Sequence, residues 1–167
     1  DKTVKHNYIA SLADKHPGRL MMEVHFYDPY QFTMMDKDAS WGKMWYYWGK
    51  GNNGTGSNRN ANSNYTESYV SSQMAKLKTA FVDKGFPVII GEFGANQRFT
   101  IGKDVVHDAS IRSWYEAVTK YAITNGCIPF AWDTNSGNGM TIINRSTVKV
   151  LNTNMMLGIK QGSNGSK

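Results

Sequence analysis

The sequence predicts an α/β fold with a parallel β-sheet, because three apolar strand patterns alternate with helical patterns along its 167 residues. Strands separated by helices are usually joined by right-handed crossovers, which place them parallel in one sheet. The middle pattern, Val88-Ile89-Ile90, is β-branched and uncharged, as expected of a strand buried on both faces. No internal repeat or domain boundary interrupts the alternation, so the chain is expected to lie within one domain.

The first predicted elements are a helix and a strand. Residues 3–13 have apolar positions at helical spacing, and "HPG" at 16–18 is expected to end this helix. "RLMMEVHFY" at 19–27 is expected to form a strand, in which successive side chains point to opposite faces. One face of it carries Glu23, His25 and Tyr27.

The next helix is predicted to begin near Asn64, because Asn64 and Glu67 have the spacing of a capping box. Gly85 is expected to end it, as glycine often does just past a helix. Its apolar stripe consists of Val70, Met74, Leu77 and Phe81.

Two more helices and a strand complete the predicted order. Asp108 is expected to cap a helix that ends at "NG", residues 125–126. The strand "CIPFAWD" at 127–133 follows, then a last helix over 146–156 and a fraying tail, "KQGSNGSK", from residue 160. The first of these helices is expected to face inward with Ile111, Trp114, Tyr115, Val118 and Ala122.

The composition argues against several classes of protein. The net charge is +6, but Lys and Arg are scattered rather than clustered, which makes nucleic-acid binding the weakest interpretation. No apolar run approaches the roughly 20 residues that cross a bilayer, and no signal peptide is expected within residues 1–167. The single cysteine, Cys127, excludes an internal disulfide and a cysteine zinc cluster, and it is expected to be a buried thiol.

Polar and aromatic side chains occur where each of the three predicted strands ends. The first strand ends with His25 and Tyr27, the second with Glu92, and the third with Trp132 and Asp133. The carboxyl ends of parallel strands meet at one edge of a sheet, where α/β proteins carry their functional sites. A carboxylate, two hydrogen-bonding groups and an indole suit a sugar ring, whose apolar face stacks on an aromatic while its hydroxyls take polar partners.

Residues 41–64, which we name the aromatic loop, begin with Trp41, Trp45 and Trp48 and continue as an Asn/Gly/Ser-rich segment. Such a composition is typical of a loop rather than of a helix or strand. Flat rings with polar edges on a loop indicate a binding surface for flat ligands.

Three segments together resemble a known family. "EVHFYDPYQFT", "VIIGEFGA" and "FAWDTN" are similar, in order and spacing, to the sixth, seventh and eighth strands of glycoside hydrolase family 5, the endoglucanase-type (β/α)8 TIM barrels. The similarity runs from about residue 20 to residue 157, and the aromatic loop most resembles the cellulase and xyloglucanase branch. The resemblance implies that residues 1–167 are the C-terminal part of a single catalytic domain, with no second domain.

The resemblance also implies roles for particular residues. Glu92 matches the family's nucleophile, which forms a glycosyl-enzyme, and His25 and Tyr27 match the pair that flanks the reacting sugar. The family's tyrosine hydroxyl donates to the nucleophile, and Trp132 matches the platform beneath the sugar. No metal or organic cofactor is required. Further substrate contacts are expected from Trp41, Trp45, Trp48 and Asn135.

The sequence departs from the family in one respect that matters for chemistry. The family's acid/base glutamate lies in an Asn-Glu-Pro pattern, which is absent here, and the other glutamates are Glu23, Glu67 and Glu116. A retaining glycosidase needs two carboxyl groups about 5–5.5 Å apart. We therefore expect the N-terminal half of the barrel to supply the acid, on a separate chain or outside these 167 residues.

Two interpretations follow from that departure. The first is an endo-acting, retaining β-1,4-glucan hydrolase, secreted or periplasmic because its polymeric substrates lie outside the cell. The alternative is a non-catalytic carbohydrate-binding protein with a decayed barrel, which would keep the tryptophans without needing a nucleophile. Hydrolysis after addition of the N-terminal half would separate the two.

Overall fold

The computed structural model describes residues 15–135, 137 and 139–164. The helix predicted over residues 3–13 lies outside the described residues. Within the described part of the chain, no helix is both long and apolar enough to cross a membrane.

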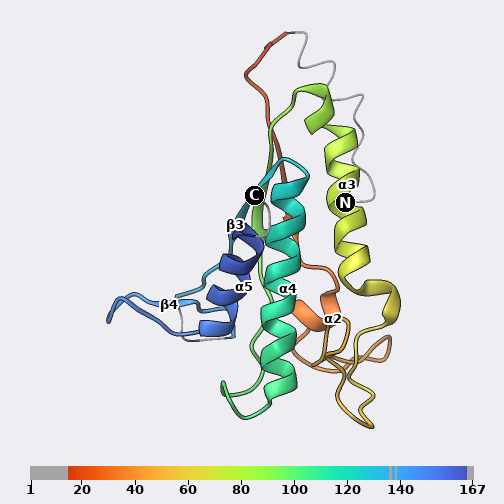
Figure 1. Ribbon diagram of the computed structural model, residues 1–167, viewed down its shortest axis with the longest axis vertical. Helices are drawn as coiled ribbons and strands as arrows, with labels where there is room; N and C mark the ends of the chain where they lie inside the picture. Colours follow the sequence, from red (N-terminus) through yellow and green to blue (C-terminus); the bar gives the residue numbers. More distant parts are fainter. Residues whose placement is uncertain (1–14, 136, 138, 165–167) are drawn as a thin grey trace.

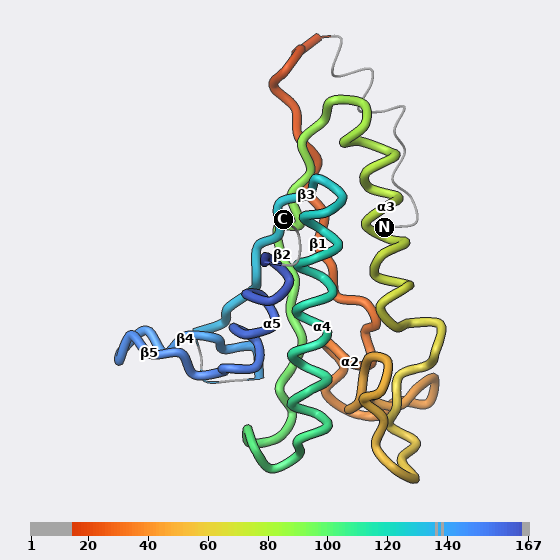
Figure 2. Tube along the Cα trace, in the orientation of Figure 1, coloured from red at the N-terminus to blue at the C-terminus, as the bar shows by residue number. Residues whose placement is uncertain are grey.

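A parallel sheet is the centre of the structure, as predicted. Its strands are β1 (Met22–Phe26), β2 (Val88–Phe93) and β3 (Cys127–Ala131), in the spatial order β1-β2-β3. The segments that follow the three strands all leave from the same end of the sheet (Figure 2). That end therefore gathers the residues at the carboxyl ends of the strands.

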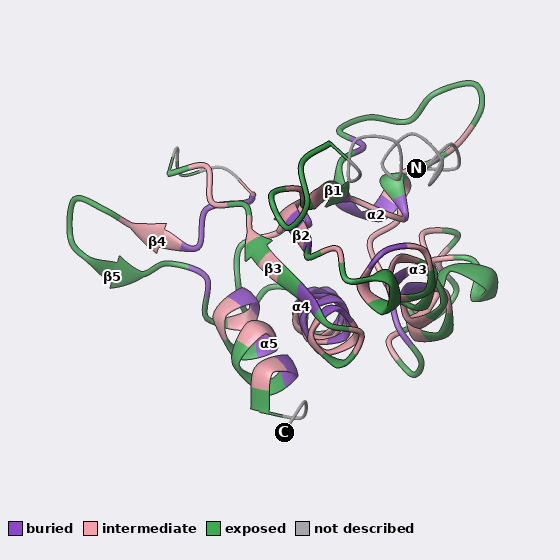
Figure 3. Ribbon diagram, turned by 90° about the horizontal axis from the view of Figure 1, so that it is seen from above, coloured by how far each residue is buried: buried purple, intermediate pink, exposed green. Residues whose placement is uncertain are grey.

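Among the described residues, the helices α3 (Glu67–Ala80), α4 (Val105–Thr124) and α5 (Thr153–Asn164) lie on one face of the sheet (Figure 3). Trp114 on α4 packs on Phe26 and Phe93, with ring centroids 6.3 and 6.2 Å apart. Cys127 is a buried free thiol on this side, as predicted, and burial raises its pKa. On the opposite face Ile128 and Phe130 are 55% and 52% exposed, so the described residues leave that face open.

The helix α3 (Glu67–Ala80) runs beside the sheet, but the predicted capping box is wrong. Asn64 lies inside a short 3₁₀ helix (Ser63–Tyr65), and Asn62 accepts the Asn64 N–H at its start. Thr66 takes the N-cap position of α3. Gly85 ends the second 3₁₀ turn, Val82–Lys84, with a φ of 83°, a conformation that favours glycine.

The helix α4 begins one turn earlier than predicted, because Asp104 rather than Asp108 is its cap. The Asp104 carboxylate accepts the backbone N–H groups of Val106 and His107, at 3.1 and 2.9 Å. The Asp108 carboxylate instead accepts hydrogen bonds from the side chain of Gln97 and the backbone of Gly102. All five residues predicted to face inward from this helix are buried.

The C-terminal prediction is wrong in both its helix and its tail. Residues 143–150 form the hairpin of β4 (Ile143–Asn144) and β5 (Lys149–Val150), which projects from the body of the molecule (Figure 1). The helix α5 (Thr153–Asn164) follows and includes much of the segment that we expected to fray.

Two glycines explain why α5 is a packed helix rather than a loose tail. A Cβ on Gly158 would lie 2.4 Å from the carbonyl oxygen of Arg112, and one on Gly162 would lie 2.6 Å from that of Glu116. Glycine therefore lets α5 approach the backbone of α4 more closely than any other residue could.

Candidate active site

A bulge in β2 places Glu92 on the open face of the sheet. Val24 pairs with Ile90, but His25 pairs with Glu92, so Gly91 is an extra residue in the ladder. Because side chains alternate with period two, one extra residue reverses the face of everything that follows it. Phe93 consequently points to the helices and Glu92 to the side of His25.

The structure brings three predicted site residues together, and we name His25, Tyr27 and Glu92 the strand-end site. The Tyr27 hydroxyl donates to Glu92 Oε2 at 2.8 Å, and His25 Nδ1 lies 3.3 Å from the same oxygen. Partial burial and the neighbouring carboxylate of Glu92 raise the pKa of Tyr27, so its hydroxyl stays protonated and able to donate. The Glu92 side chain is 26% exposed and remains open to a ligand.

Trp132 lies directly beside this site. It follows β3, and its backbone N–H donates to the carbonyl of Phe93, the residue after Glu92, at 2.9 Å. Its side chain is exposed, so an indole face is free at the strand ends.

Asp133 and Asn135, which come next, shape the loop after β3. Asp133 accepts the backbone N–H groups of Asn135, Ile142 and Ile143, and it therefore holds that loop rather than facing a ligand. Asn135 is exposed and has a φ of 51°, which a residue with a short polar side chain tolerates better than most.

The three tryptophans of the aromatic loop lie in three different environments. Trp41 is 65% exposed, with its ring 6.0 Å from that of Tyr30. Trp45 is half-buried against Tyr65. Trp48 is only 1% exposed and donates its indole N–H to the carbonyl of Tyr65, so it belongs to the core. The predicted role of Trp48 in substrate binding is therefore wrong, because no ligand face is free.

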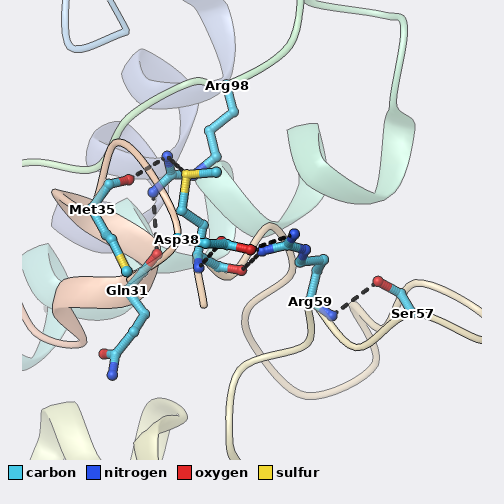
Figure 4. A network of polar contacts seen from close by, with 7 residues as sticks. Gln31, Met35, Asp38, Ser57, Arg59 and Arg98 are labelled. Atoms are coloured by element: carbon cyan, nitrogen blue, oxygen red, sulfur yellow. Dashed lines mark hydrogen bonds and ion pairs between the residues drawn. The ribbon is translucent and has the colours of Figure 1, made fainter. Parts of the chain in front are cut away.

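Charged side chains hold the aromatic loop and the segment before it in place (Figure 4). Arg59 donates two hydrogen bonds to Asp38, at 2.5 and 2.9 Å, and these hold the pKa of Asp38 down, at about 2. Arg98 reaches across from the loop after β2 and donates to three backbone carbonyls around the short helix α2 (Tyr30–Thr33). These acceptors belong to Gln31, Phe32 and Met35.

Two polar residues that support the site were not predicted. Thr33 donates to the backbone carbonyl of Tyr27, and this contact ties α2 to the strand-end site. His107 is buried. Its Nε2 accepts a hydrogen bond from the backbone N–H of Arg98, and its Nδ1 donates to the carbonyl of Tyr46. One nitrogen that accepts and one that donates require the neutral ring. Burial lowers the pKa of His107, in agreement with that state. Neither contact follows a helical or strand period, so neither residue had a sequence signal.

A cavity of about 390 Å³ opens among the loops that follow the three strands. It offers hydrogen-bonding groups and aromatic rings to a polar ligand. Its lining residues are Asp36, Met44, Tyr46, Asn96, Gln97, Arg98, Phe99 and Gly139. The described residues contain no group of three or more His, Cys, Asp and Glu side chains arranged to hold a metal ion.

Comparison with known proteins gives a consistent result. The family model described as cellulase (glycosyl hydrolase family 5) matches residues 5–138. A xyloglucan-specific endo-β-1,4-glucanase of Bacteroides ovatus is 28% identical over 149 residues, which are 88% of this chain and 28% of the relative. Endoglucanase A of Paenibacillus barcinonensis is 27% identical over 162 residues, or 93% of this chain and 37% of the relative.

A comparison with solved structures finds glucanases of the same family. A xyloglucan-specific β-1,4-glucanase from a ruminal metagenomic library, in complex with XXLG, matches with a TM-score of 0.80 and 39% identity. The match covers 98% of this chain and 44% of that one. The chain thus spans less than half the length of each of these relatives.

Proposed function

The chain belongs to glycosyl hydrolase family 5, whose fold is the (β/α)8 barrel, and from this premise we propose that it is the C-terminal part of an endo-acting β-1,4-glucan hydrolase. Its three strands would be the sixth, seventh and eighth of the barrel. The observation that carries the proposal is the hydrogen bond from Tyr27 to Glu92, beside His25, at the ends of two adjacent parallel strands.

Glu92 is the nucleophile in this proposal. Its carboxylate attacks the anomeric carbon, the bond to the leaving sugar breaks, and a glycosyl ester forms that water later hydrolyses with overall retention. Tyr27 and His25 both contact Oε2, which leaves Oε1 to attack. A hydrogen bond to the charged form keeps a carboxylate ionised, as a nucleophile must be.

The leaving sugar needs a proton, which we assign to a glutamate on the N-terminal half of the barrel. Glu67 accepts the backbone N–H of Lys50, and Glu116 lies on α4, behind the sheet. The N-terminal half would also cover the open sheet face with its exposed Ile128 and Phe130.

The substrate that we propose is a β-1,4-glucan, with xyloglucan the first to test, since two of the similar proteins are named for it. Trp132 offers a platform for the reacting sugar. Trp41, which is exposed, and Trp45, which is half-buried, offer rings to outlying sugars, and Asn135 is exposed in the loop after β3. A secreted or periplasmic enzyme would meet such polymers.

The test combines residues 1–167 with an N-terminal half of the barrel and measures cleavage of xyloglucan and soluble cellulose derivatives. Proton NMR of the first product should show retained anomeric configuration. A 2-deoxy-2-fluoro glucan inactivator should label the peptide that carries Glu92. Inverted product or a label elsewhere contradicts the assignment, and glucan binding without any cleavage would favour the carbohydrate-binding alternative.

A further inference from the structure

A second carboxylate lies behind His25, on the side away from Glu92. Glu23 Oε1 is 3.3 Å from His25 Nε2, while His25 Nδ1 is 3.3 Å from Glu92 Oε2. The imidazole therefore lies between two carboxylates, each facing one of its nitrogens.

Gly91 makes room for this arrangement. A Cβ on Gly91 would lie 2.0 Å from Glu23 Oε1 and 2.8 Å from its Cδ, so the Glu23 carboxylate occupies the space that any side chain would take. Gly91 is also the extra residue that turns Glu92 toward His25. One glycine thus sets the position of both carboxylates relative to the ring.

We propose that Glu23 is a positioning residue that holds the His25 ring for the reaction at Glu92; this inference rests on the proposed function. An ionised carboxylate can only accept, so the nitrogen that faces Glu23 must carry a proton. By the same rule Nδ1, 3.3 Å from the ionised Glu92, also carries its proton, so Glu23 and Glu92 hold the ring from its two nitrogens. The His25 and Glu23 side chains are 48% and 56% exposed, so packing within the described residues does not fix the ring.

Glu23 lies below the strand end and acts through His25 rather than on the substrate. Removing it should leave substrate binding intact while letting the imidazole ring rotate. A carboxylate that orients a metal-ligating histidine is commonly worth about 10- to 100-fold, and we expect an effect of about tenfold for Glu23. The loss should therefore appear in kcat.

The experiment uses this chain assembled with the N-terminal half and compares five variants. Glu23→Met should lower kcat about tenfold with KM within about twofold, whereas Glu23→Gln, whose amide oxygen can still accept from Nε2, should retain most activity. The double variant Glu23→Met with His25→Ala should have the same kcat as His25→Ala alone, because Glu23 acts only through His25. Glu116→Gln, behind the sheet, is the matched control and should change neither constant.

Gly91→Ala should reproduce the loss of Glu23→Met, because its Cβ displaces the Glu23 carboxylate. If that variant does not fold, Glu23→Ala with Gly91→Ala removes the clash and tests the same lost acceptor. Unchanged kcat in Glu23→Met, or multiplicative losses in the double variant with His25→Ala, overturns the proposal.

A readout independent of cleavage separates this inference from the proposed function. In protein labelled with ¹⁵N-histidine, the shifts of His25 should report a proton on Nε2, and Glu23→Met should change them. An unchanged His25 spectrum contradicts the role of Glu23 even in an active enzyme. If Glu23→Met changes the His25 spectrum but the 2-deoxy-2-fluoro glucan does not label Glu92, the Glu23–His25 contact is supported. The assignment of Glu92 as the nucleophile is then contradicted.

Discussion

The strand-end site and the aromatic loop both present groups that suit a sugar, but they hold them by different means. In the strand-end site, two paired strands place Tyr27 and His25 within 2.8 and 3.3 Å of one oxygen of Glu92. In the aromatic loop, by contrast, Trp41 and Trp48 lie only seven positions apart, yet one is exposed and the other buried. Strands give side chains a direction through pairing, whereas a loop gives direction only through individual contacts.

The contacts that order the loop are polar and come from distant residues. Arg59 binds Asp38, and the carbonyl of Tyr46 accepts from the buried His107. Substitutions in the strand-end site should therefore change chemistry without unfolding, and substitutions in the loop should change binding or stability. The following predictions test this difference.

Glu92→Gln has the largest expected effect. The amide keeps the shape of the side chain but cannot act as the nucleophile, so cleavage by the complete enzyme should fall by at least about a thousandfold. Glucan affinity and thermal stability should stay close to those of the parent protein. Activity above a few per cent would exclude Glu92 as the nucleophile.

Tyr27→Phe should lower kcat by about 10- to 100-fold and change KM much less. The ring remains, but the hydrogen bond to Glu92 is lost, and bonds to charged groups are worth about 1.5–3 kcal/mol. Steady-state kinetics on a defined oligosaccharide measure this split. A rise in KM with unchanged kcat would mean that Tyr27 binds substrate rather than tuning the carboxylate.

Trp48→Ala and Trp41→Ala form a matched pair within one loop. Loss of the buried Trp48 should destabilise the fold by about 3–5 kcal/mol, which chemical denaturation measures. Loss of the exposed Trp41 should leave stability unchanged and weaken binding of long glucans a few-fold, by the loss of one stacking ring. Equal stabilities of the two variants would contradict the assigned environments.

Asp38→Asn should have the smallest effect, a slight decrease in Tm at neutral pH. The pKa of Asp38 is about 2 in the folded state, chiefly because of the hydrogen bonds from Arg59, and lies near 3.9 in an unfolded chain. Its contribution is therefore fully present above about pH 4 and is lost as the pH falls through about 2. The difference in Tm between parent and variant should disappear over that range, and a difference that grows with acidity would contradict the assignment.

Local pattern was sufficient for the alternation of the three sheet strands with α3 and α4 and for the composition of the strand-end site. Alternation along 19–27 placed His25 and Tyr27 on one side, and the apolar run before Gly91 indicated a strand that ends at Glu92. The inward face of α4 also followed from spacing alone, since helical periodicity depends only on the helix itself. Helix ends were less predictable, because Asp104 and Asp108 are both suitable caps and only one has the backbone geometry.

The sequence by itself determined the parallel α/β class, the residue types at the three strand ends and the absence of an Asn-Glu-Pro pattern for a second acid. Only the tertiary structure decided which face Glu92 takes, which tryptophans are free and what the glycines of α5 do. Each of these depends on contacts between distant segments: the pairing of His25 with Glu92, the contact of Trp48 with Tyr65, and the approach of Gly158 to Arg112. Periodicity describes one segment at a time, whereas register, burial and close backbone approach belong to pairs of segments.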